Sequence, residues 1–347
     1  LDNEVFDQCK LVSGPLWTDY LRKSLDPNHD PMRSCNHSYT PWSLLIDGRV
    51  ELTEACDGDS DCRARTIIFK GDYKISMGEW HNLSEDFVFE NDFVEVECQI
   101  GNASVYNFLH HQIFRKDNFR TNGTSTRLPL KSGINNPPSV YMIVIDSMGA
   151  SHGRRVFNRT QSFLKQEFGA VEMEHVNKVG LNSRPNGLAM LLGKLTEDIN
   201  RDIYGLPSQK SDWNYTQSCR TFLDDKGFIL KEFEKSGYIT MMAEDWPLGV
   251  FNWPDCNGFQ NQSATHYMRP FQLRFKDKSK QMKQDMGKDH CFEPHLFLNE
   301  YLEQFIRAYP DSPKASLVWP VDLAHDLPNE PFHADKQYLQ LLERNRE

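Results

Sequence analysis

The chain has 347 residues, 39% of them hydrophobic and 25% charged, which is enough to bury a full core and to form about two domains. Its 39 basic and 49 acidic residues give a net charge of −10, which argues against a nucleic acid or an anionic membrane surface as partner. No run of roughly 18 apolar residues occurs, so nothing in the sequence predicts a membrane span.

Seven Asn-x-Ser/Thr sequons and eight cysteines indicate a protein of the secretory pathway. The cysteines form no Cys-x-x-Cys pair, which favours disulfide bonds over zinc or redox chemistry. Five lie before residue 100 and three after residue 218, so either one bridge joins the two halves or two thiols stay free. We expect an extracellular, secreted glycoprotein whose signal peptide is removed or lies before Leu1; the alternative is a cytosolic protein with reduced cysteines and chance sequons. The sequons are at Asn36, Asn82, Asn102, Asn122, Asn158, Asn214 and Asn261.

The first part of the chain, residues 1–135, is predicted to be a β-rich module that contains disulfide bonds. Three short segments alternate apolar and polar residues with a period of two, which is the pattern of half-buried strands. The dipeptide Asp47-Gly48 after the first segment is typical of a hairpin turn. A polar, Pro- and Gly-rich stretch then separates this module from the rest, so we place the domain boundary near residue 135. The three segments are 42–46, 66–70 and 92–98.

Residues 136–347 alternate strand and helix patterns, which predicts an α/β domain with a mostly parallel sheet flanked by helices. Runs rich in β-branched residues indicate buried strands, and apolar residues at helical spacing followed by Gly indicate helices. The predicted strands are 140–145, 170–175, 238–243 and 315–319. The predicted helices are 157–168, the stretch from Pro185 to Gly193, the stretch from Ile229 to Gly237, the apolar stripe 298–306, and 335–346.

Asp146 and Ser183 carry the sharpest chemical signal. Asp146 closes the first predicted strand of this domain and therefore emerges at the carboxyl edge of the sheet, where open α/β folds bind ligands, so it is a candidate metal ligand. Ser183 opens a Ser-x-Pro segment at a helix start, where unsatisfied N–H groups suit an anionic ester; the alternative is an ordinary helix-start serine. A serine hydroxyl needs a base or a metal to ionise it. Since no Gly-x-Ser-x-Gly surrounds Ser183, the pattern favours metal activation.

Asp322 and His325 form a second candidate cluster at the exit of another predicted strand. An acid and an imidazole three residues apart bind one cation if the loop curls, because their oxygen and nitrogen donors then converge. Instead of a cation site, the pattern also allows Asp326 to orient the imidazole. The alternative is that Asp326 caps a turn and His325 is a surface histidine.

The segment after the predicted strand 238–243 has two open interpretations. Glu244 and Asp245 either face the same site or terminate the strand as turn formers. The aromatic residues that follow, among them Trp246 and Trp253, either pack this loop or form a wall for a substrate.

These motifs resemble the alkaline phosphatase and sulfatase superfamily. More closely, the chain is similar to an uncharacterised family of animal secreted sulfatase-like proteins, described as a domain of unknown function. The resemblance spans most of residues 136–330, and the cysteine-bearing N-terminal segment is similar to that family's leader region. The matching stretches are Val144-Ile145-Asp146-Ser147-Met148, Asn177-Lys178-Val179-Gly180-Leu181-Asn182-Ser183-Arg184-Pro185-Asn186, Ser236-Gly237-Tyr238, Ala243-Glu244-Asp245-Trp246, His266-Tyr267-Met268-Arg269-Pro270-Phe271 and Ala324-His325-Asp326.

The resemblance implies a metal-bearing ester hydrolase with an alkaline phosphatase-like core. Asp146 then matches a first metal ligand, Ser183 the nucleophile, and Asp322 and His325 the ligands of another metal site. Asn182 would donate to a nonbridging oxygen of the ester. The expected cofactor is a divalent metal, zinc first, with calcium, magnesium or manganese as alternatives.

Four departures from that pattern affect the expected activity. Asn186 and Gly187 stand where sulfatases carry Ser and Arg, so conversion of Ser183 to formylglycine is not expected. Leu181 stands where family members carry an acid. The later Asp-His-Gly of the superfamily does not occur after Asp326. From this we expect a core cut short at the C-terminus, with an incomplete metal site and no activity of its own.

Two functions remain open from the sequence. The first is a secreted, metal-dependent hydrolase of phosphate or sulfate esters in its complete form. The second is an inactive extracellular binding protein that retains the fold and recognises a glycan or another small anionic ligand. Stoichiometric bound metal would favour the first.

Overall fold

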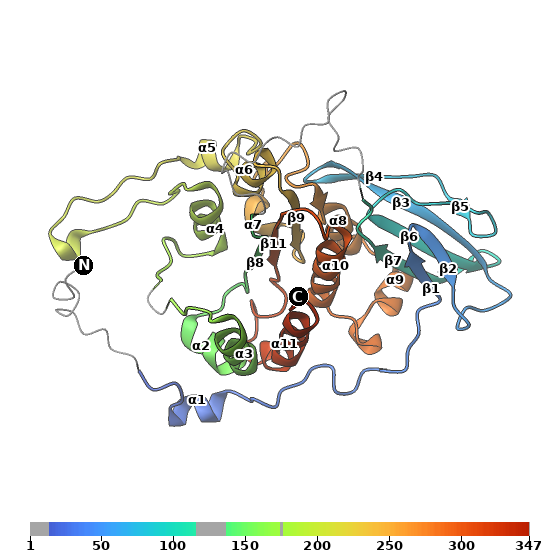
Figure 1. Ribbon diagram of the computed structural model, residues 1–347, viewed down its shortest axis with the longest axis horizontal. Helices are drawn as coiled ribbons and strands as arrows, with labels where there is room; N and C mark the ends of the chain where they lie inside the picture. The colour runs from blue at the N-terminus through green and yellow to red at the C-terminus, as the bar shows by residue number, and fades with distance from the viewer. Residues whose placement is uncertain (1–13, 116–136, 174–175, 347) are drawn as a thin grey trace. The chain divides into compact units, whose positions relative to one another are not determined.

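The computed structural model describes residues 14–115, 137–173 and 176–346 (Figure 1). The chain forms two compact units. The described residues of the smaller unit are 14–31, 148–173 and 327–346. Those of the larger unit are 32–115, 137–147 and 176–326. The predicted boundary near residue 135 lies outside the described residues.

The helices and strands of the described residues are as follows. The strands are β1 (Ser43–Ile46), β2 (Arg49–Leu52), β3 (Asp61–Gly71), β4 (Lys74–Met77), β5 (His81–Asn82), β6 (Phe93–Ile100), β7 (Ala103–His111), β8 (Val140–Ile143), β9 (Ile239–Glu244), β10 (His266–Tyr267) and β11 (Lys314–Trp319). The α-helices are α1 (Asp19–Ser24), α2 (Ala150–Val156), α3 (Asn158–Phe168), α4 (Ser183–Leu192), α5 (Tyr215–Cys219), α6 (Ile229–Lys235), α7 (Gly249–Asn252), α8 (Arg269–Lys276), α9 (Lys280–Asp285), α10 (Pro294–Ala308) and α11 (Asp335–Arg344).

A four-stranded parallel sheet forms the centre of the larger unit. Its strand order is β10-β9-β11-β8, and β11 pairs with β9 on one side and β8 on the other. Every residue of β11 is buried, as expected for a strand covered on both faces. Apolar residues of α4 and α6 pack with Met242 and Leu317 in one core cluster, and α10 contacts β9 and β11 (Figure 1). The prediction of a parallel sheet flanked by helices is therefore confirmed.

The N-terminal part of the larger unit is antiparallel. β3, β4, β6 and β7 form a sheet in the order β4-β3-β6-β7, with β5 paired to β3. β1 and β2 form a separate hairpin with Ile46 opposite Arg49. Asp47 and Gly48 join them with φ angles of 48° and 80°, which is the left-handed pair that a tight hairpin turn requires. The predicted hairpin turn is confirmed.

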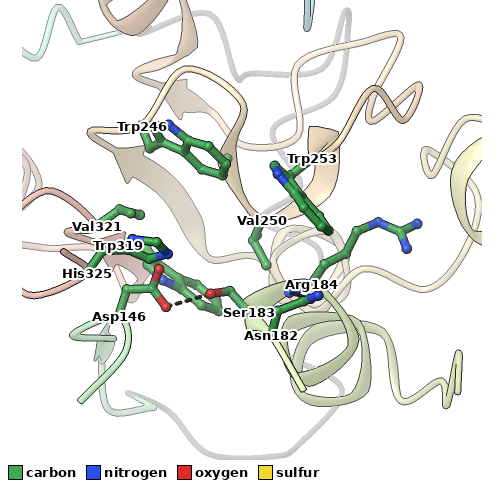
Figure 2. Close-up of a pocket in the computed structure, with 11 residues that line it drawn as sticks. Asp146, Asn182, Ser183, Arg184, Trp246, Val250, Trp253, Trp319, Val321 and His325 are labelled. Atoms are coloured by element: carbon green, nitrogen blue, oxygen red, sulfur yellow. Dashed lines mark hydrogen bonds between the residues drawn. The ribbon is translucent and has the colours of Figure 1, made fainter. Parts of the chain in front are cut away.

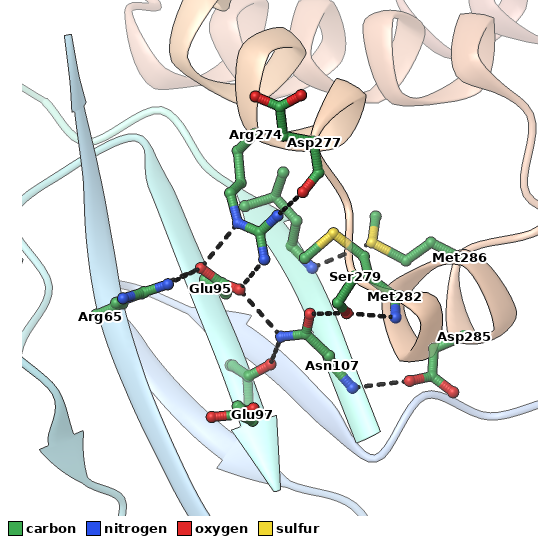
Figure 3. Close-up of polar contacts among 12 residues, drawn as sticks. Arg65, Glu95, Glu97, Asn107, Arg274, Asp277, Ser279, Met282, Asp285 and Met286 are labelled. Atoms are coloured by element: carbon green, nitrogen blue, oxygen red, sulfur yellow. Dashed lines mark hydrogen bonds and ion pairs between the residues drawn. The ribbon is translucent and has the colours of Figure 1, made fainter. Parts of the chain in front are cut away.

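A buried carboxylate ties this antiparallel sheet to the helices beside it. Glu95 on β6 accepts hydrogen bonds from Arg65 of β3, Arg274 of α8 and Asn107 of β7 (Figure 3). Burial alone would raise the Glu95 pKa, but the two guanidinium groups outweigh it and hold the pKa below its ordinary value. Ser279, at the start of α9, donates to Asn107 Oδ1 at 2.8 Å. These contacts hold α8 and α9 on the sheet.

Three disulfide bonds are present in the described part of the chain, all within the larger unit. Cys35–Cys291 joins residues 256 positions apart, so one bridge does link the two halves of the sequence. The other pairs are Cys62–Cys98 and Cys219–Cys256. Cys56 is a free thiol, and Cys9 lies outside the described residues. None of the described helices combines the length and apolar character needed to cross a membrane.

The smaller unit is helical. α3 packs against α11 (Figure 1). Asp335, at the start of α11, accepts hydrogen bonds from the backbone N–H groups of Arg159 and Thr160 and from the Thr160 hydroxyl. The side chain of Asp335 therefore satisfies N–H groups in the first turn of α3 that have no partner within that helix. As predicted, α3 ends at Gly169, which has a φ of 60°.

One predicted strand is wrong. Residues 170–173 form no strand, and the rest of the predicted span, 174–175, lies outside the described residues. Val171 and Met173 are 84% and 76% exposed. Their alternation with polar residues matches the strand pattern, but they have no neighbouring strand to pair with, and pairing rather than pattern decides strand formation.

Candidate functional site

Three strand ends meet at one edge of the parallel sheet. Because β8, β9 and β11 are parallel neighbours, the residues that follow them lie on the same side. Asp146 follows β8, and its backbone N–H donates to the Pro320 carbonyl after β11 at 3.2 Å. The Asp146 side chain is buried. The next residue, Ser147, has a φ of 54°, and this turn lets its N–H donate to Asp146 Oδ1 at 2.9 Å.

Ser183 begins α4 and contacts Asp146 directly. The Ser183 hydroxyl donates to Asp146 Oδ1 at 2.7 Å (Figure 2). Asn182 is the N-cap of α4, and its Oδ1 accepts the N–H of Arg184 at 3.2 Å. This use of Oδ1 leaves the amide Nδ2 as the donor that Asn182 can offer to a ligand. The two residues with the strongest sequence signal are thus in contact.

The loop before Ser183 is held by Asn186. Its Oδ1 accepts the N–H of Val179 at 2.7 Å, and its Nδ2 donates to the carbonyls of Gly180 and Asn182. Asn186 therefore orders the loop that delivers Ser183. This positioning role could not be read from the sequence.

A cavity of about 230 Å³ opens beside the Asp146–Ser183 pair. Its lining includes Asn182 and His325 together with a group of apolar side chains (Figure 2). Arg184 also lines it, but the Arg184 guanidinium donates to the Ser218 carbonyl. The apolar lining consists of Trp246, Val250, Trp253, Trp319 and Val321.

The second predicted cluster is assembled only in part. His325 lies at the cavity, and its Nδ1 is 2.7 Å from Asp326 Oδ1. Both side chains are more than half exposed. Asp322 is exposed and does not line the cavity.

Two further carboxylates, Glu244 and Asp245, end β9 beside this site. Glu244 is buried and accepts the N–H of Val250 at 2.9 Å. Asp245 Oδ1 accepts the N–H of Val321 at 2.7 Å. Burial raises the pKa of each carboxyl to about 7. The negative charge of Asp322 raises the Asp245 pKa further.

The donor chemistry at the strand ends fits a divalent cation next to Asp146. Asp146 and Ser183 supply a carboxylate and a hydroxyl, both oxygen ligands, within one hydrogen-bond length. Asp245 Oδ2, after β9, is buried without a hydrogen-bond partner, so one carboxyl oxygen at this edge of the sheet is left unsatisfied. In the described part of the larger unit, the sets of three acid, histidine or cysteine groups that lie within 4.8 Å of one another include none of Asp146, Asp322 and His325. Neither predicted metal site is therefore assembled as a set of three such groups. The sets found there consist mainly of cystine sulfurs.

Gly187 leaves no room for a side chain in α4. A Cβ at this position would lie 2.3 Å from Val250 Cγ2 and 3.3 Å from Trp319 Cη2, well inside contact distance. A larger side chain, such as arginine, is therefore excluded here by packing.

Comparison with known proteins gives one match. A family model described as "Protein of unknown function (DUF229)" matches residues 28–347. No curated protein and no solved structure is significantly similar to the chain.

Proposed function

We propose that this chain, which belongs to the DUF229 family of proteins of unknown function, carries the nucleophile of a metal-dependent hydrolase that acts on phosphoric or sulfuric esters. The observation that supports the proposal most strongly is the 2.7 Å hydrogen bond from Ser183 Oγ to Asp146 Oδ1. It joins a nucleophile candidate to a proton acceptor at the edge of the sheet where ligands bind in α/β folds.

The residues support a two-step reaction. Ser183 Oγ attacks the phosphorus or sulfur, and its proton passes along the existing hydrogen bond to Asp146 Oδ1. The bond to the ester oxygen breaks, and that oxygen takes a proton from water. Asn182 Nδ2 donates to a nonbridging oxygen at the cavity. A water molecule then attacks the covalent intermediate and gives one proton to the hydroxide left by the first step. The bond to the Ser183 oxygen breaks, and this oxygen takes back the proton held by Asp146.

A divalent cation bound by Asp146 and the Ser183 oxygen would lower the hydroxyl pKa and offset charge on the ester. Arg184, which also lines the cavity, adds a positive charge there, and one nitrogen of its guanidinium donates to the Ser218 carbonyl. Zinc is the cation that we propose first, with calcium, magnesium and manganese as alternatives.

The local chemistry favours an unmodified serine and an alkaline phosphatase-like core over a formylglycine sulfatase. Gly187 has no space for the sulfatase arginine. Asn186, in place of Ser, uses its amide to order the loop before Ser183. We therefore rank phosphate esters above sulfate esters as substrates.

We also propose that the protein is secreted and glycosylated. Three disulfide bonds in the described residues are typical of an oxidising compartment. Every described sequon asparagine is exposed, so a glycan fits the folded chain at each of them. These are Asn36, Asn82, Asn102, Asn158, Asn214 and Asn261.

Hydrolysis of p-nitrophenyl phosphate and p-nitrophenyl sulfate tests this proposal. The protein and its Ser183→Ala variant are assayed with each divalent cation in turn, and Ser211→Ala, a serine away from the cavity, serves as the matched control. We expect phosphate hydrolysis that Ser183→Ala lowers at least about a thousandfold and that Ser211→Ala leaves unchanged. Equal rates in the protein and in Ser183→Ala would contradict the role of Ser183.

A second candidate function is a binding protein that retains the fold without catalysis. Two observations favour it: the exposed Asp322 lies outside the cavity, and His325 is more than half exposed. Elemental analysis separates the two candidates. About one bound divalent cation per chain, lost in Asp146→Asn, supports the hydrolase, and none supports the binding protein.

A further inference from the structure

The cavity beside Ser183 has an aromatic wall. Figure 2 shows Trp246 and Trp253 across the cavity from the Asp146–Ser183 pair, with Val250 between them. Trp253 is 39% exposed, so part of its indole is open to a ligand in the cavity. This wall therefore offers apolar surface directly above the candidate nucleophile.

We propose that this wall binds the organic group of the ester and that it selects a single aromatic ring. The inference rests on the proposed function, because it assigns the part of the substrate that Ser183 does not attack. It names Trp253 and Trp246 as the residues that determine specificity.

The size of the cavity fits one ring. Apolar cavities of about 150 Å³ already accept benzene, and pockets for drug-sized ligands begin at about 300 Å³. The volume here, about 230 Å³, lies between these values. It accommodates a phenyl group with its ester, but not a chain of sugars.

The apolar character of the wall favours an aromatic ring over a sugar ring as ligand. When a sugar enters the cavity, its hydroxyl groups lose their hydrogen bonds to water, and each hydroxyl then needs a hydrogen bond to the protein. The wall opposite Ser183 is formed by the indole rings of Trp246 and Trp253 and by Val250 (Figure 2). The polar groups that line the cavity lie mainly on the other side, around Asp146 and Asn182 (Figure 2). An aromatic ring needs no such partners and gains contact with the indoles.

The wall is fixed by the fold. Glu244 accepts the N–H of Val250 at 2.9 Å and thereby holds the loop that carries Trp246 and Trp253. Gly249 adopts a φ of 54° directly above the Glu244 carboxylate, where a Cβ would lie 2.6 Å from Oε2. The indole side chains are therefore already in place before a ligand binds. Because little conformational entropy is lost on binding, this arrangement favours affinity.

Calorimetric binding of two phosphate esters tests the inference without any turnover. Phenyl phosphate and glucose 6-phosphate are titrated into the Ser183→Ala protein at one fixed zinc concentration. The same titrations are repeated after adding Trp253→Ala, Trp253→Phe or Trp80→Ala. Trp80 stacks on Arg63 and Arg65 in the antiparallel sheet, away from the cavity, so its removal is the matched control.

We expect phenyl phosphate to bind at least about tenfold more tightly than glucose 6-phosphate. Trp253→Ala should abolish most of this preference, Trp253→Phe should restore it in large part, and Trp80→Ala should leave it unchanged. Equal affinities, a preference that survives Trp253→Ala, or no binding of either ester would overturn the inference. A ring preference without hydrolysis by the unmodified chain would instead contradict the proposed function alone.

Discussion

Replacing Glu244 by Gln should change how stability depends on pH. Glu244 is buried, and burial raises its pKa from 4.5 to about 7. A carboxyl whose pKa is raised on folding stabilises the folded state below its ordinary pKa, and this stability is lost as the pH rises through the folded-state value. At 1.36 kcal/mol per pKa unit, the loss between pH 4.5 and pH 8 is about 3 kcal/mol. Gln cannot ionise, and its Oε1 still accepts the N–H of Val250.

The assay is urea unfolding from pH 4.5 to pH 8.5, with a chelator present, on the protein and on Glu244→Gln. The variant should match the protein near pH 4.5 and exceed its free energy of unfolding by up to about 3 kcal/mol at pH 8. Glu232→Gln, an exposed carboxylate on α6, is the control and should stay within about 0.5 kcal/mol throughout. A free-energy difference between protein and Glu244→Gln that does not grow with pH would refute the reasoning.

Two further predictions concern packing and covalent links. Gly187→Ala should destabilise the protein by about 1–3 kcal/mol, because the Cβ of the new alanine would lie 2.3 Å from Val250 Cγ2. The control is Gly153→Ala, whose Cβ would meet its nearest atom at an ordinary 3.6 Å. Thermal melts should show a clear loss of stability for Gly187→Ala and no comparable loss for Gly153→Ala. Replacing both Cys35 and Cys291 by Ala should lower the free energy of unfolding by about 2–5 kcal/mol. The disulfide bond closes a loop of 256 residues, and without it the unfolded chain gains conformational entropy. An unchanged urea midpoint would contradict this prediction.

The sequence predicts the parts of the fold that depend on local patterns. Asp146 follows a buried strand and Ser183 opens a helix, and parallel pairing alone brings such positions to one edge. Asp47-Gly48 and Gly169 mark a turn and a helix end because their backbone angles favour those residue types.

The remaining features depend on contacts between distant segments. Residues 170–173 show that a strand pattern fails without a partner strand. Cys35–Cys291 could be inferred only as one of two alternatives, because pairing depends on proximity in the fold. The role of Asp245, which accepts the Val321 N–H, requires knowledge of which strands are neighbours. The same holds for the indole wall, which the sequence leaves open between loop packing and substrate contact.

The most direct test of the central claim is to look for a covalent phosphoryl group on Ser183. The protein is mixed with phenyl phosphate and its preferred cation, quenched in acid, and digested for mass spectrometry, alongside Asp146→Asn. The account predicts phosphorylation of the peptide that contains Ser183. In Asp146→Asn, residue 146 can neither take the proton nor bind the cation, so labelling should slow by about a hundredfold or more. A label on another residue, or phosphate release with Ser183 unmodified at every time point, would contradict it.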